Sequence, residues 1–158
     1  MDPGAGPGPA PKLTDHLRNN WNFRLVLVAM ILVPPSVAFF LPPTIVGLGD
    51  FIWLSGAWLV AAVLLYLGDE TFVPGKDNLS TGGGHKGSVP YRVLTNPLFL
   101  LSVAVLVFAP APLAFYGPAI IAGSPDWVWL VASYVLAVAT VFVMYRTIVS
   151  IENSDPAA

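Results

Sequence analysis

The sequence contains no cysteine and little charge. Without thiols, the 158-residue chain has no disulfide, no thiolate metal site and no thiol nucleophile. Charged residues make up 10% of the chain, against about 25% in a typical soluble domain. Hydrophobic residues make up 56%, and the mean hydropathy is +0.73, which together predict a lipid-facing surface. The formal net charge of −2 gives no reason to expect a nucleic-acid partner.

Ligands and reactive groups are also scarce in the apolar parts of the chain. His16 and His85 lie outside the long apolar runs, so a membrane haem held by histidines has no ligands here. Neither has a second ligand at metal spacing, and we expect no metal or cofactor. The tract GGGHKGS lacks the GxxxxGK[ST] pattern of a phosphate loop and is read as a linker. No nucleophile and base lie together in an apolar run, so we do not expect an enzyme.

Four apolar runs dominate the rest of the sequence. Each is about as long as a helix that crosses roughly 30 Å of hydrocarbon. Because lipid offers the backbone no hydrogen bonds, and the runs do not alternate as barrel strands do, they are predicted to be helices. The predicted fold is an all-α membrane protein with four transmembrane helices, at about residues 22–41, 51–67, 97–117 and 127–149.

The segments around these runs are polar or rich in glycine and proline. We expect a disordered N-terminal segment over 1–19, a first hairpin over 20–67, a linker over 68–95, a second hairpin over 96–150 and a tail over 151–158. The two short connections carry no Lys or Arg. The positive-inside rule then predicts a cell-membrane protein with both termini and the linker in the cytoplasm. The residues on which this orientation depends are Lys12, Arg18, Arg24, Lys76, Lys86, Arg92 and Arg146.

The two halves of the chain resemble each other without a gap. Residues 34–50 read PPSVAFFLPPTIVGLGD and residues 110–126 read PAPLAFYGPAIIAGSPD, a shift of 76 positions (34 to 110). Matched Pro, Gly, Asp and Trp residues in one register indicate a duplication, while chance similarity of two apolar hairpins is the alternative. Both copies start on the same side, so we expect a tandem, parallel repeat. Matched pairs include Asn20/Asn96, Phe23/Phe99, Gly47/Gly123 and Asp50/Asp126.

Asp50 and Asp126 are the acids on the predicted outer side, and each precedes an apolar run. One interpretation is a helix N-cap that satisfies free backbone N–H groups. The other is a symmetric pair at the mouth of a cation or proton path.

Prolines lie late in the first and third runs, at Pro34, Pro35, Pro110 and Pro112. A proline removes a backbone hydrogen bond from a helix, which predicts a matched pair of kinks. Alternatively, the freed carbonyl groups could coordinate an ion. The sequence leaves both interpretations open.

Small residues recur with small-xxx-small spacing on the second and fourth runs. Such faces let helices approach closely. We expect these two helices to meet through them, or the faces to serve a homo-oligomer or another subunit. The residues are Gly56, Ala57, Ala61, Ala132, Ser133 and Ala137.

Three classes of function follow from these features. The small size and the lack of buried charge favour a structural or accessory subunit of a larger respiratory, transport or envelope assembly. The paired aspartates and prolines allow a small cation or proton transporter or channel. A membrane enzyme has the least support. The expected partners are the lipid bilayer and either another membrane protein or further copies of the chain.

Overall fold

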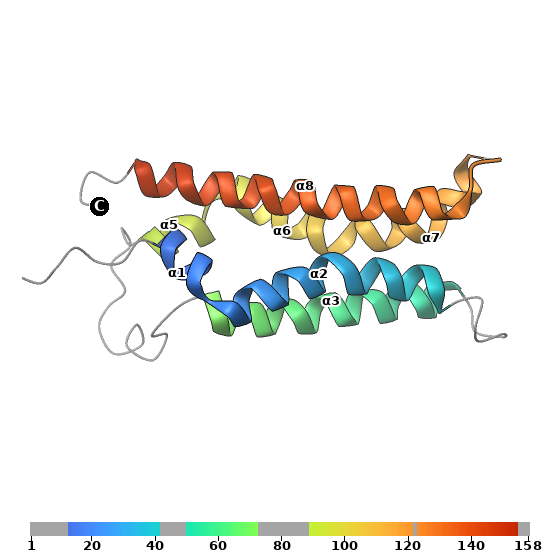
Figure 1. Cartoon of the computed structure of the whole chain (residues 1–158), viewed down its shortest axis with the longest axis horizontal. Helices are drawn as coiled ribbons and strands as arrows, with labels where there is room; N and C mark the ends of the chain where they lie inside the picture. The colour runs from blue at the N-terminus through green and yellow to red at the C-terminus, as the bar shows by residue number, and fades with distance from the viewer. Residues whose placement is uncertain (1–12, 42–49, 73–88, 122, 155–158) are drawn as a thin grey trace, which may run out of the picture.

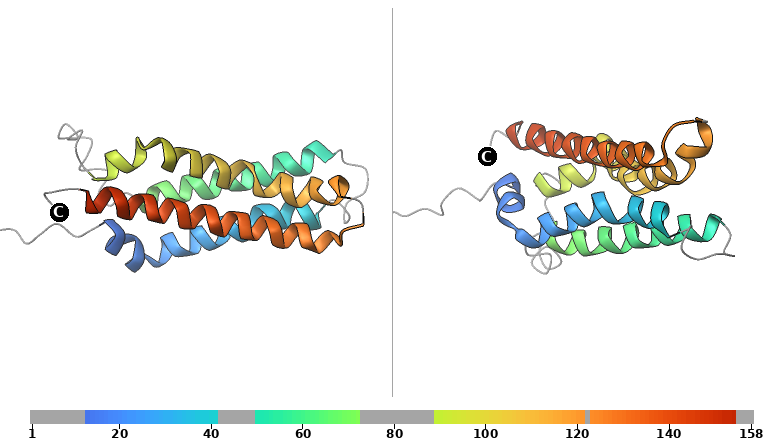
Figure 2. Two further views of the ribbon diagram at one scale, coloured as in Figure 1. Left: turned by 90° about the horizontal axis from the view of Figure 1, so that it is seen from above. Right: turned by 45° about the vertical axis from the view of Figure 1, so that its right-hand side comes forward.

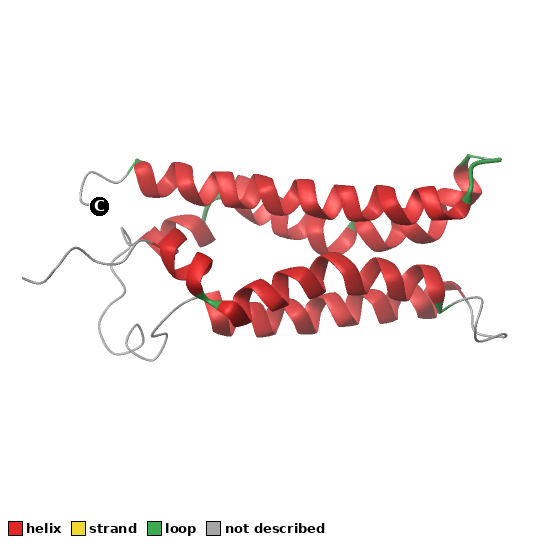
Figure 3. Cartoon of the chain, viewed as in Figure 1, coloured by secondary structure: helices red, strands yellow, loops and turns green. Residues whose placement is uncertain are grey.

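A computed structural model of the chain describes residues 13–41, 50–72, 89–121 and 123–154. Within these residues all regular structure is helical, which confirms the predicted helical class (Figure 3). Figure 1 shows how the helices are arranged. They are α1 (Leu13–Asn19), α2 (Trp21–Phe40), α3 (Asp50–Phe72), α5 (Val89–Leu94), α6 (Pro97–Phe108), α7 (Pro110–Ile120) and α8 (Asp126–Asn153).

Two helices of the described chain, α2 and α8, are long and apolar enough to cross a membrane. The pair α6 and α7 passes the same test together, and counts as a third span if the bent pair is one segment. The apolar part of α3, Ile52–Gly68, is shorter. Length and composition therefore give two to three candidate spans, which fits a membrane protein.

The long helices form two antiparallel pairs. In one pair α2 packs along α3, and in the other α6 and α7 together pack along α8 (Figures 1 and 2). The pairs are joined mainly where α2 packs against α7, with a smaller contact between α2 and α8. In this arrangement α2 and α7 meet in the centre, while α3 and α8 make almost no contact with each other.

The helices α2 and α6 begin with the same side-chain cap. The Asn20 carboxamide oxygen accepts a hydrogen bond from the Phe23 backbone N–H at 3.2 Å. The Asn96 oxygen accepts from the backbone N–H groups of Leu98 at 2.9 Å and Phe99 at 3.2 Å. Each asparagine thereby satisfies a donor that a helix start leaves without a partner.

The prolines act differently in the two helix pairs, and only one of the two predicted kinks coincides with a break in a helix. Helix α2 runs unbroken through the adjacent Pro34 and Pro35. The corresponding segment breaks at Ala109, where α6 and α7 meet at a bend of 54°. Pro110 and Pro112 lie just after the bend and lack the N–H groups that would bond to the carbonyls of Leu106 and Phe108 just before it. Lost donors there coincide with the break, as expected at a proline kink.

Part of the segment expected to be disordered is a helix. Leu13 and Leu17 are one turn apart in α1, and both are buried against Val93 of α5, Phe99 of α6 and Ile148 of α8. Apolar side chains at i and i+4 gave α1 one face to pack, which the glycine and proline content of the preceding residues obscured. Residues 1–12 lie outside the described part.

The boundaries of the predicted linker and tail also change. Helix α3 continues to Phe72, α5 occupies Val89–Leu94, and α8 continues to Asn153. Residues 73–88, with the tract GGGHKGS, lie outside the described residues. These helix ends extend beyond the apolar runs because polar residues such as Glu and Lys also favour helix.

Candidate functional site

The fully buried small residues lie in the centre of the bundle. Ala57 of α3 packs in a cluster with Ala38 of α2 and Ala111 of α7. Ala61 of α3 and Ala137 of α8 both reach a second cluster, built around Met30, Leu106 and Val107. Ala57, Ala61, Ser133 and Ala137 each have 0% of their surface exposed.

The sequence interpretation expected these small residues to bring α3 and α8 together. In the structure they do not. The two helices lie diagonally across the bundle and make almost no contact. Their small residues leave room for α2 and α7 instead, because those helices cross in the centre between them. Gly56 and Ala132 are only half-buried, and a methyl group added at Gly56 would meet nothing within 4 Å. At Gly56, therefore, no neighbouring helix of the described chain approaches closely.

The central crossing also contains the prolines. Pro34, Pro35 and Pro110 each have less than 2% of their surface exposed, and Pro112 is half-buried. A proline ring is compact and carries no N–H donor, so it can be buried against a neighbouring helix without a hydrogen-bond partner. The structure places three of these four prolines in the packed interior.

A hydrogen bond between side chains joins the two helix pairs, four residues before the end of α2 and eight residues after the start of α8. The Ser36 and Tyr134 hydroxyl oxygens lie 2.7 Å apart, and Ser36 Oγ also donates to the Leu32 carbonyl at 2.6 Å. The sequence interpretation missed this bond, since nothing in either sequence segment identifies the partner.

The other buried hydroxyl groups bond within their own helices. Ser102 donates to the Leu98 carbonyl at 2.8 Å, and Ser133 donates to the Leu130 carbonyl at 2.7 Å. Thr140 and Thr147 donate to the carbonyls of Leu136 and Val143 at 2.8 and 2.9 Å. Each hydroxyl is thereby satisfied at its own helix and does not point a free donor into the bundle.

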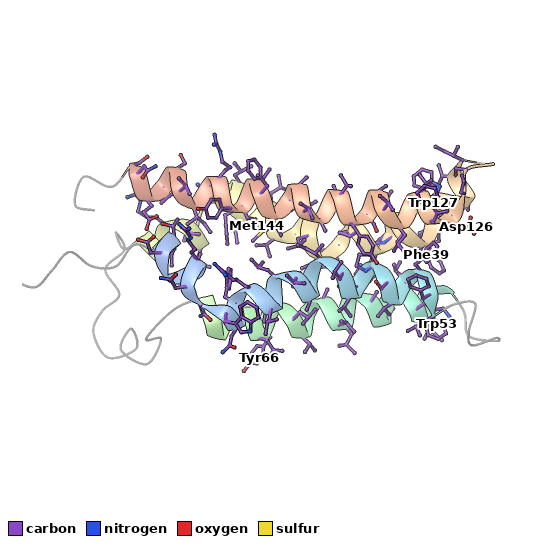
Figure 4. All side chains as sticks on the ribbon, viewed as in Figure 1. Phe39, Trp53, Tyr66, Asp126, Trp127 and Met144 are labelled. Atoms are coloured by element: carbon purple, nitrogen blue, oxygen red, sulfur yellow. The ribbon has the colours of Figure 1, made fainter. Side chains whose placement is uncertain are left out.

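Asp126 and the start of α3 at Asp50 lie at the end of the bundle opposite α1 and the last turns of α8. Asp126 is exposed at the start of α8, where Pro125 takes the N-cap position and no side chain caps the helix (Figure 4). A carboxylate in the first turn still interacts favourably with the helix dipole. Helix α3 begins at Asp50, but the side chain of Asp50 lies outside the described residues. The predicted cation path at this pair remains a prediction.

The opposite end of the bundle, which we call the basic end, carries Arg18, Arg24, Arg92 and Arg146. It comprises α1, α5, the start of α2 and the end of α8, which lie together in both views of Figure 2. These are the four basic residues whose side chains are described. Their common position agrees with the charge asymmetry of the sequence.

A buried carboxylate links the two ends of the chain at the basic end. Glu152 of α8 has 4% of its surface exposed. Its Oε2 accepts a hydrogen bond from the Thr14 hydroxyl at 2.6 Å, and its Oε1 accepts from the Thr14 backbone N–H at 3.4 Å. The sequence interpretation missed this contact because it assigned Thr14 to a disordered segment and Glu152 to a free tail.

Within the described residues, no group of three or more His, Asp or Glu side chains could hold a metal ion. Comparisons with protein families, with curated proteins and with solved structures find no match to this chain. A functional proposal must therefore come from the geometry described above.

Proposed function

We propose that this chain is a non-catalytic, four-span membrane protein that serves as an accessory subunit of a larger membrane assembly. Four spans require that α3 cross the bilayer and that α6 and α7 together form one bent span. The apolar part of α3, Ile52–Gly68, lies among the shorter apolar helices of 10–17 residues, and its length is at the lower end of the range of about 17–25 residues for a membrane-spanning helix. The shared caps at Asn20 and Asn96 support two tandem hairpins related by duplication.

The observation that carries the proposal is where the hydroxyl groups inside the bundle make their hydrogen bonds. Ser102, Ser133, Thr140 and Thr147 each donate to a carbonyl of their own helix, and Ser36 bonds to Tyr134. A carrier commonly directs polar or ionisable groups toward a central binding site. Here those groups are used to close the packing, which favours a structural role over a transport pathway.

The outer surface supports the second half of the proposal. Large apolar side chains are exposed along α3 and α8, among them Leu59 at 67% and Val135 at 62%. Such surfaces suit lipid and the helices of another membrane protein equally well in composition. In the proposed membrane orientation, both termini and the basic end face the cytoplasm, because the described arginines gather there.

Purification of a tagged copy from its native membrane in mild detergent tests the proposal. Native mass spectrometry of the product should record a larger membrane protein bound in a fixed ratio. Substituting Leu59→Trp or Val135→Trp adds bulk to an outward face without disturbing the core. Lipid can adapt to that bulk but a packed helix cannot, so at least one variant should lose the partner while the chain stays folded.

Two outcomes would count against the accessory role. Recovery of the chain alone, or only with copies of itself, would remove the partner that the role requires. Cation flux in liposomes that disappears in an Asp50→Asn and Asp126→Asn double variant would instead favour a transporter. Flux at the background level in both proteins is the result that we expect.

A further inference from the structure

An apolar groove separates the two helix pairs at the basic end. Its volume is about 860 Å³, and it is lined by side chains from α1, α2, α3, α5, α6 and α8. Most are aliphatic or aromatic, such as Met30, Val103 and Phe142. Cavities of this volume are typical of sites that bind small organic molecules, which usually combine an apolar lining with a few polar groups.

The groove has the depth of one leaflet of a bilayer. Along α8 it extends from Val138 to Ile148. These ten steps of about 1.5 Å correspond to about 15 Å, or half of a hydrocarbon core of about 30 Å. A helix of a partner protein would need a groove about twice as long to pack along its whole span. A lipid chain, which ends near the midplane, fits this length.

The polar groups of the groove lie where a headgroup would be. Arg18 of α1 and Arg24 in the first turn of α2 line its outer part, and both are exposed. Tyr66 and Tyr145 are the other polar side chains among the lining residues, and none of the described lining residues is a carboxylate. Figure 4 shows Tyr66 in the half of the bundle nearer α1 and the last turns of α8. Arginine binds phosphate oxygens through paired N–H groups and keeps its charge at all relevant pH values.

We propose that this groove binds one anionic phospholipid from the leaflet at the basic end, with its acyl chains on the apolar lining and its phosphate at Arg18 and Arg24. The proposal rests on the membrane insertion argued above. It goes beyond ordinary solvation by lipid because the charge at the mouth selects the headgroup. The bound lipid fills the space between the two helix pairs on that side of the bundle.

The test compares two lipids that differ only in headgroup. Delipidated protein in detergent is titrated with phosphatidylglycerol or phosphatidylcholine of the same acyl chains, and native mass spectrometry records the bound lipid. We expect phosphatidylglycerol to bind more tightly. A basic residue near an anionic lipid contributes a factor of about five, so Arg18→Gln with Arg24→Gln should weaken phosphatidylglycerol binding by roughly 30-fold.

Two further variants separate the site from general surface charge. Arg146→Gln removes the same charge from an exposed position of α8 that does not line the groove, and should leave lipid binding unchanged. Ala62→Trp places a large ring in the groove from an exposed position of α3, and should weaken the binding of both lipids. Equal binding of the two lipids, or an equal loss in Arg146→Gln, overturns the proposal.

The same spectra keep this proposal separate from the accessory role. A protein partner and a bound lipid add different masses, so each is scored independently. If the protein binds its partner but shows no preference for phosphatidylglycerol, the lipid site alone is overturned. If it prefers phosphatidylglycerol but has no protein partner, the accessory role alone is overturned. A photoreactive probe attached at Ala62→Cys, the sole thiol of that variant, should label lipid; labelling of another protein instead would show that a partner occupies the groove.

Discussion

Asn20 and Asn96 occupy equivalent positions in the two halves of the chain, and both oxygens accept from the backbone N–H of the phenylalanine three residues later at 3.2 Å. The sequence similarity between the halves therefore coincides with the same local interaction. The first turns of α2 and α6 lie at the same end of the bundle, where each helix pair begins.

These caps should contribute similarly to stability. Replacing Asn20 or Asn96 with alanine removes the acceptor and should lower the free energy of unfolding by about 1 kcal/mol in each case. Thermal unfolding of the purified protein in detergent gives the two values. Asn22→Ala is the control, because Asn22 is exposed in the first turn of α2 and does not cap it. A loss at one cap only would argue that the two helix starts are not equivalent.

The hydroxyl pair between the helix pairs should show energetic coupling. Ser36→Ala and Tyr134→Phe each remove the 2.7 Å hydrogen bond. In the double variant the second substitution therefore costs no further stability through this bond. A double-mutant cycle should give a coupling energy of about 0.6 kcal/mol, the average for such bonds in membrane bundles. Ser102→Ala paired with Tyr134→Phe should be additive, because Ser102 bonds to its own helix. Additivity in both cycles would contradict the bond.

Two glycine substitutions should have opposite effects. A methyl group at Gly117 would collide with the ring of Trp129, which also donates from Nε1 to Ser124 Oγ at 2.7 Å. Gly117→Ala should therefore lower stability by about 1–3 kcal/mol. A methyl group added at Gly56 of α3 would meet nothing within 4 Å. Gly56→Ala should therefore raise stability by about 0.5–1 kcal/mol, because alanine has a better helix propensity than glycine. The melting temperatures of both variants in detergent test the two predictions: a higher melting temperature of Gly117→Ala would contradict the packing around Gly117, and a lower one of Gly56→Ala would contradict the open space beside Gly56.

The sequence predicted the long helices well because their signal is local. Each apolar run indicates a helix by itself, and the charges at its ends indicate an orientation. The same composition hid α1, whose Leu13 and Leu17 become informative only when Val93 and Ile148 are known to lie beside them. The residues that contact one another across the bundle follow from tertiary packing, which a single sequence does not specify.

The small residues and the prolines illustrate this limit. Their spacing indicated close helix packing, and Ala57, Ala61, Ser133 and Ala137 are indeed fully buried. Spacing does not identify the opposing helix, and the expected contact of α3 with α8 was wrong because α2 and α7 lie between them. Matched prolines likewise gave one unbroken helix and one bend of 54°, since the neighbouring residues decide how a lost hydrogen bond is accommodated.

Thr14 should stabilise the basic end through its two bonds to the buried Glu152 carboxylate. Thr14→Val keeps the side-chain volume and removes the hydroxyl donor at 2.6 Å from a group that is 4% exposed. A hydrogen bond to a charged group contributes about 1.5–3 kcal/mol, so unfolding should become easier by that amount. Thr95→Val is the matched control, since its exposed hydroxyl bonds to the Tyr91 carbonyl of α5. Equal losses of stability in the two variants would show that the link between Thr14 and Glu152 adds nothing.

The proposed orientation can be tested directly because the chain has no cysteine. Asn153→Cys places one thiol at the basic end, and Ile121→Cys places one at the opposite end; both positions are exposed. The excess of arginine at the basic end predicts that this end faces the cytoplasm. A membrane-impermeant maleimide applied to intact cells should then label Ile121→Cys and leave Asn153→Cys unmodified until the membrane is permeabilised. Labelling of both thiols in intact cells would rule out helices that cross the membrane between these ends, and the reverse pattern would invert the orientation while keeping the spans.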